Sequence, residues 1–126
     1  MKKILLSVFT LSAFALSAQT FVSTTPENKN VILEEFTGIS CGYCPDGHSI
    51  ATGIHNTIPN DFAVIAIHAG SFASPQGAGT DFRTSAGTAI DSYWGQHGYP
   101  SGTVNRPASG DVGRSAWAGA TNTLLA

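Results

Sequence analysis

The chain has 126 residues, of which 42% are hydrophobic and only 11% are charged, with a formal net charge of −2 at neutral pH. This length suits one domain with a modest core. The few Lys and Arg residues form no cluster that could neutralise a row of phosphates, so the sequence argues against nucleic acid as a partner.

The N-terminus has the pattern of a secretory signal peptide over residues 1–18. A basic start, Met1-Lys2-Lys3, precedes an apolar run over residues 4–16, and small residues near Ala18 suit cleavage. The run is too short for a comfortable membrane span. We therefore expect an exported protein in the periplasm, the outer membrane or the extracellular space. A polar segment at 19–30 would then precede one domain at 31–126.

Residues 31–70 predict a strand, a helix and a second strand. The first run, VILEEFTG, mixes β-branched and apolar residues and stops at a glycine. Ile50, Ile54 and Ile58 recur at helical spacing, which predicts a helix from Pro45 to residue 58. The run FAVIAIHAG at 62–70 is nearly all apolar, as in a strand covered on both faces. Together they predict a βαβ unit with adjacent parallel strands.

The remaining chain predicts a helix, a short strand and a weak terminal helix. Residues 81–95 keep helical spacing, with Asp81 placed to cap the start and Gly95 to end it. A strand over residues 103–105 should follow Pro100, and the tail at 113–126 is weakly helical. No further strand is predicted, so we expect the C-terminal part of the fold to be truncated.

Both cysteines lie in EEFTGISCGYCPDGH, residues 34–48, between the first strand and the first helix. A thiolate at such a junction meets the positive end of the helix, which lowers its pKa. A second thiol three residues on can release a mixed disulfide. A disulfide that closes so short a loop should stabilise the fold by only about 2 kcal/mol. The spacing therefore favours a redox-active Cys41–Cys44 disulfide, with no other cofactor, over a structural one.

The motif EEFTGISCGYCPDGH and the downstream GYPSGTVNR resemble the thioredoxin-like domain of a Bacteroidota family, the secreted proteins related to outer membrane protein twenty-eight. The resemblance covers about residues 31–106 and implies a thioredoxin-like α/β fold. It implies that Cys41 is the exposed nucleophile, Cys44 the resolving thiol and Pro100 a cis-proline facing the sulfurs. Glu35 occupies the position of a buried acid that relays a proton to or from the resolving thiol.

Alternation along the strand lets only one of Glu34 and Glu35 face inward, and we predict that it is Glu35. The alternative is that both glutamates are solvated at a strand end, since carboxylates are rarely buried without a partner.

The predicted function is thiol-disulfide oxidoreduction, with protein thiols and disulfides as partners. One alternative is a copper or zinc site formed by Cys41, Cys44 and His97, with His48 and His68 as further candidates, but the chain has neither a second CxxC nor paired histidines. Another is a surface-binding or adhesin-type module, associated with the outer membrane or cell surface, whose disulfide is structural.

Overall fold

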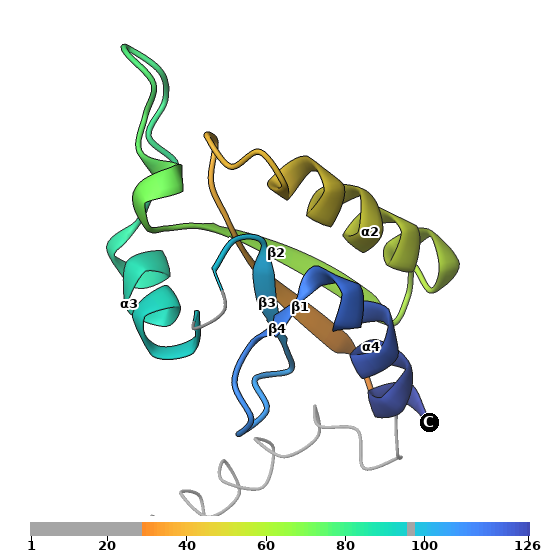
Figure 1. The fold of residues 1–126 in the computed structure, drawn as a ribbon. Helices are drawn as coiled ribbons and strands as arrows, with labels where there is room; N and C mark the ends of the chain where they lie inside the picture. Colours follow the sequence, from red (N-terminus) through yellow and green to blue (C-terminus); the bar gives the residue numbers. More distant parts are fainter. Residues whose placement is uncertain (1–28, 96–97) are drawn as a thin grey trace, which may run out of the picture.

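The computed structural model describes residues 29–95 and 98–126, which form a mixed α/β fold around one four-stranded sheet (Figure 1). In chain order the elements are β1 (Val31–Thr37), α2 (Cys44–Thr57), β2 (Phe62–His68), the 3-10 helix η2 (Ser71–Ala73), α3 (Ser85–Trp94), β3 (Ser101–Val104), β4 (Val112–Gly113), the 3-10 helix η3 (Arg114–Ala116) and α4 (Trp117–Leu125). The predicted signal peptide and His97 lie outside the described residues. Within those residues, no helix is long and apolar enough to cross a membrane.

The strands lie in the order β2-β1-β3-β4. Strands β1 and β2 are parallel, from the pair Val31 and Phe62 to the pair Thr37 and His68. Strand β3 runs antiparallel to β1, and β4 runs antiparallel to β3. The predicted parallel βαβ unit and the thioredoxin-like α/β fold are therefore confirmed.

The C-terminal part of the sheet differs from the sequence prediction. Strand β3 begins at Ser101, ahead of the predicted residue 103, and a further strand, β4, pairs with it. The prediction that no strand follows β3 is wrong. Strand β4 consists of Val112 and Gly113 alone, and two residues are too few to show a strand's alternating pattern.

Two hydrophobic cores lie on opposite faces of the sheet. Helices α2 and α4 cover one face, and α3 covers the other (Figure 1). Alternate residues of β1 point to opposite faces, so Leu33 and Phe36 belong to different cores. The first core contains Val31, Leu33, Ala51, Phe62, Val104 and Trp117, and the second contains Phe36, Ile67 and Ala69 packed against Ile90, Trp94 and Tyr99.

Strand β2 was predicted to be covered on both faces, and this is wrong. Its ends, at Phe62 and Ile67, are buried, but residues 63–66 are exposed. The reason is the strand order, because β2 is at the edge of the described sheet and contacts only β1 within it. An apolar composition alone does not distinguish a central strand from such an edge strand.

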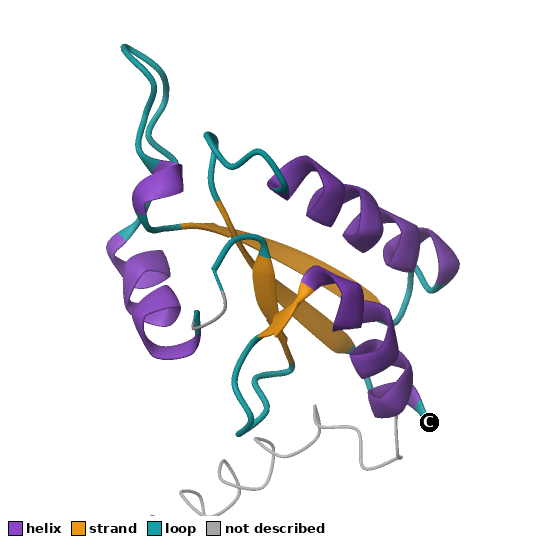
Figure 2. Cartoon of the chain, in the orientation of Figure 1, coloured by secondary structure: helices purple, strands orange, loops and turns teal. Residues whose placement is uncertain are grey.

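The predicted cap of the second long helix is also wrong. Helix α3 begins at Ser85, and the side chain of Thr84 accepts a hydrogen bond from Gly87 N at 2.9 Å. Asp81 instead accepts hydrogen bonds from the backbone and guanidinium of Arg83. This places Asp81 in the loop between η2 and α3, which projects away from the sheet (Figure 2).

Candidate functional site

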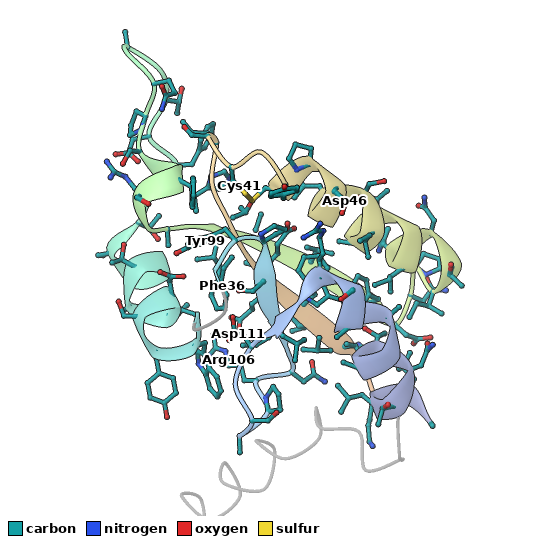
Figure 3. The ribbon with its side chains drawn as sticks, in the orientation of Figure 1. Phe36, Cys41, Asp46, Tyr99, Arg106 and Asp111 are labelled. Carbon is teal, nitrogen blue, oxygen red and sulfur yellow. A yellow bond between two sulfur atoms is a disulfide. The ribbon has the colours of Figure 1, made fainter. Side chains whose placement is uncertain are left out.

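Cys41 and Cys44 form a disulfide where the chain passes from β1 into α2 (Figure 3). Their Cα atoms are 5.4 Å apart, a separation that is usual for a disulfide. The turn is closed by hydrogen bonds from Cys41 N to Gly38 O and from Cys44 N to Cys41 O. Cys44 is the first residue of α2, so the helix begins one residue before the predicted Pro45. Cys41 is 7% exposed and Cys44 is 1% exposed, which is the predicted order.

The loop before Cys41 is held by the segment around η2. A Cβ on Gly38 would lie 2.4 Å from the backbone carbon of Phe72, so a larger residue would push these segments apart. Ser40 N donates to Phe72 O at 2.9 Å, and Gln76 Nε2 donates to Ser40 Oγ at 2.7 Å. Residues that follow β2 in the sequence therefore hold the loop that leads to Cys41.

Glu35 and Pro100 meet at the first turn of α2. A Cβ on Gly47 would lie 2.9 Å from Glu35 Oε1 and 3.0 Å from Pro100 Cγ, so glycine is what allows both to approach the helix so closely. Gly47 is on the same side of the helix as Cys44, one turn further on. The Tyr99–Pro100 peptide bond is cis. The structure thus brings Glu35 and Pro100 together beside the helical turn that begins with Cys44.

The carboxyl group of Glu35 is buried, and one of its oxygens lacks a hydrogen-bond partner within the described part of the chain. Its side chain is 1% exposed, and burial raises its pKa to about 7. Among the described residues, Glu35 Oε1 has no hydrogen-bond partner, although His48 Nε2 lies 3.3 Å away. This separation is within hydrogen-bond reach, but in the present orientation the two groups form no hydrogen bond. A carboxyl group with this pKa can accept and release protons near neutral pH.

Glu34 has the opposite environment on the other face of β1. Its carboxylate accepts hydrogen bonds from the Arg106 guanidinium through both oxygens and from Thr103 Oγ1. The hydrogen bond from Arg106 holds the pKa of Glu34 below its usual range. Both glutamates are buried, so the alternative in which both are solvated is wrong.

His48 is the site residue whose role the sequence did not indicate, because the sequence suggested it only as a metal ligand. It lies on α2 one turn after Cys44, at a spacing that places both on one side of the helix. Its Nε2 is 3.1 Å from Thr37 Oγ1 and 3.3 Å from Glu35 Oε1. The four-residue spacing of Cys44 and His48 could have indicated that they share one side of a helix. It gave no indication that Glu35 would lie near them.

The metal alternative gains no support from the described part of the chain. Within residues 29–95 and 98–126, no group of three or more His, Cys, Asp or Glu side chains is arranged to hold a metal ion. His97, the histidine that this alternative requires, lies outside those residues. The proposed set of Cys41, Cys44 and His97 therefore stays a sequence prediction.

Three exposed apolar side chains belong to the segments next to the disulfide. Ile39 and Tyr43 flank Cys41 in the sequence, and Phe72 belongs to η2, which holds the loop before it. The Arg114 guanidinium lies 5.4 Å from the centre of the Tyr43 ring and forms an ion pair with Asp46. Apolar side chains close to Cys41 in the sequence are thus open to solvent, and Arg114 is held between Tyr43 and Asp46.

Comparisons with known proteins support the fold. No family model and no curated protein matches the chain. Among solved structures, it is similar to protein AGR_C_4864 from Agrobacterium tumefaciens, with a TM-score of 0.57 and 17% sequence identity. The match covers 79% of this chain and 46% of that protein, so this chain spans less than half of that protein's length. At this identity the similarity shows a shared fold.

The environment of Glu35 predicts an unusual pH dependence of stability. The unfolded chain should lose this proton near the ordinary pKa of 4.5, whereas the folded chain keeps it until about pH 7. Between these values the folded state binds more protons, so the free energy of unfolding should fall as pH rises, by about 3 kcal/mol in total. Chemical denaturation at a series of pH values would measure this.

Glu35→Gln is the matched variant, because its amide is neutral at every pH. We expect it to remove this fall and to exceed the wild type in stability above pH 7. Glu34 contributes in the opposite sense, since its pKa is lowered and its stabilisation is lost as pH falls below the ordinary value. If the free energy of unfolding of Glu35→Gln falls between pH 4.5 and 7 as much as that of the wild type, another group is responsible.

Proposed function

We propose that this chain is an exported thiol-disulfide oxidoreductase that uses Cys41 and Cys44 as its redox pair. The observation that carries the proposal is the disulfide at the start of α2, beside a buried carboxyl group whose pKa is raised to about 7. The resemblance to the Bacteroidota family supports export and protein thiols or disulfides as substrates. The exposed apolar side chains around Cys41 suit a polypeptide substrate.

The reductive reaction begins with the Cys41 thiolate. It attacks one sulfur of a substrate disulfide, the substrate S–S bond breaks, and one substrate thiolate leaves as a mixed disulfide forms. Cys41 is suited to this step because it is the more exposed of the two cysteines. The loop that carries it is held by η2, so the attacking sulfur has a fixed position.

The second step needs a proton acceptor for Cys44. The Glu35 carboxylate takes the Cys44 proton, and the Cys44 thiolate attacks Cys41 Sγ. The Cys41–Cys44 disulfide forms and the second substrate sulfur leaves as a thiolate, so the substrate gains two electrons and the pair loses two. Glu35 is suited to this role because it lies against Gly47, one turn from Cys44. The reverse sequence would oxidise a substrate dithiol.

The redox equilibrium of the pair tests this proposal. We expect Cys41 and Cys44 to equilibrate with mixtures of reduced and oxidised glutathione, with a reduction potential above about −300 mV, because structural disulfides usually resist such buffers. Alkylation of free thiols followed by mass measurement would give the reduced fraction in each buffer. The Cys41→Ser, Cys44→Ser double variant is the control for background labelling.

The outcome also distinguishes the alternatives. A disulfide that stays oxidised in excess reduced glutathione would contradict the proposal and favour a binding module with a structural disulfide. Tight binding of one copper ion that is lost in His97→Ala would instead favour the metal site.

A further inference from the structure

We propose that His48 is the residue through which the buried carboxyl group of Glu35 exchanges its proton with solvent. The purpose of this exchange rests on the proposed function, because each reductive cycle leaves on Glu35 the proton taken from Cys44. The exchange itself is a property of the folded protein and can be measured without any substrate.

The geometry joins a buried group to an exposed one. Glu35 is 1% exposed, whereas the His48 side chain is 48% exposed, and the two approach to 3.3 Å between Oε1 and Nε2. Thr37 Oγ1 lies 3.1 Å from the same nitrogen and is itself fully buried. The Nε2 end of the imidazole is therefore held beside the sheet, while 48% of the His48 side chain is open to solvent.

An imidazole is suited to this transfer because its two nitrogens exchange roles. Once the ring turns so that Nε2 is aligned with the Glu35 carboxyl group, Nε2 accepts its proton, and Nδ1 releases its own proton to water. The products are a Glu35 carboxylate, a neutral imidazole protonated on Nε2 and one proton in solvent. A proton moving inward follows the same steps in reverse, and no oxidant or reductant is needed.

Glu35 and His48 also line a cavity of about 740 Å³. It lies between α2 and the edge strand β2, and Glu35, His48, Ala51, His55 and Val64 are among its lining residues. Much of its lining is apolar, which disfavours ordered water beside the carboxyl group. Direct exchange between Glu35 and water in this cavity is the competing route that an experiment must exclude.

Other titratable groups near Glu35 are placed less favourably. Opposite Glu35 in the sheet are Ala66 of β2 and Gly102 of β3, which carry no charge. His68, at the end of β2, has a pKa lowered by burial and by His48. On α2, Asp46 is paired with Arg114.

Two further titratable residues line the cavity, and one of them provides a control. Asp61 precedes β2, and His55 lies two turns beyond His48 on α2, with its Nδ1 3.1 Å from Phe62 O. On α4, Trp117 and Thr121 are buried but uncharged. His55 thus resembles His48 in residue type, helix and cavity, but its hydrogen bond is to β2.

The test is the rate at which Glu35 loses its proton after a rapid rise in pH, followed by the infrared band of the protonated carboxyl group in the oxidised protein. Glu35→Gln identifies the band. We expect His48→Gln to slow the loss by about tenfold or more, since a positioned proton carrier usually contributes at least this much. His55→Gln should leave the rate unchanged. Adding imidazole should restore the rate in His48→Gly but not alter the wild type.

An unchanged rate in His48→Gln would overturn the proposal and assign the exchange to water in the cavity. If His48→Gln fails to fold, Thr37→Val provides a second measurement, because it leaves His48 in place but removes its hydrogen bond, and it should also slow the loss. Oxidoreductase activity is measured separately. If proton loss is slow in His48→Gln but the wild type has no oxidoreductase activity, only the proposed function is contradicted. If the wild type is active but proton loss in His48→Gln is as fast as in the wild type, only the role of His48 is contradicted.

Discussion

Cys44→Ser should accumulate a mixed disulfide with substrate proteins on Cys41, whereas Cys41→Ser should accumulate none. In the first variant the more exposed thiol still attacks, but the thiol that releases the product is gone. In the second variant only the buried Cys44 remains, at the start of α2. Non-reducing gel electrophoresis after incubation with an unfolded disulfide-containing protein, with and without a final reducing step, would show the difference.

The controls for this experiment follow from the fold. Both variants lose the same disulfide, so any loss of stability common to both cannot explain a difference in trapping. Circular dichroism should show that both are folded. Equal trapping by the two variants would contradict the assignment of Cys41 as the nucleophile, and trapping by neither would contradict the oxidoreductase proposal.

Trp117→Ala should reduce the free energy of unfolding by about 3–5 kcal/mol, a large fraction of the stability of a small domain. Trp117 is fully buried in the core between the sheet, α2 and α4, and its Nε1 donates to Val112 O at 3.2 Å. The substitution removes a large apolar volume and leaves a cavity beside β4. Urea denaturation followed by far-ultraviolet circular dichroism would measure the loss.

Tyr93→Ala is the matched control, because it also truncates an aromatic side chain on a helix but at a position that is 74% exposed. We expect its effect to be below about 0.5 kcal/mol. A cost below about 1 kcal/mol for Trp117→Ala would contradict the packing of α4 against the sheet.

The adjacent residues Glu34 and Glu35 show how one strand can hold two carboxyl groups with different properties. Glu34 is paired with Arg106, which favours the charged form, whereas Glu35 is buried beside α2, which favours the neutral form. A group that is neutral in one part of the physiological pH range and charged in another is suited to proton transfer. A permanently paired carboxylate is suited to stabilising the fold.

The sequence by itself determined the elements of the βαβ unit and the place of the cysteines within it. The apolar run of β1 and the isoleucine spacing of α2 are local patterns, and local patterns report the conformation of their own segment. The position of Cys41 and Cys44 between these elements followed directly. The short strand β4 was missed because two residues show no period. The Thr84 cap was missed because Asp81, three residues earlier, is also a residue type that caps helices.

Only the tertiary structure decided which glutamate would be neutral and which residues would surround it. Alternation required Glu34 and Glu35 to face opposite sides, but the partner on each side comes from a distant segment: Arg106 follows β3, and His48 lies on α2. The meeting of Glu35 and Pro100 at Gly47 likewise depends on the pairing of β3 with β1. A local pattern carries no record of such contacts, because burial and charge pairing arise only when the chain folds and brings distant segments together.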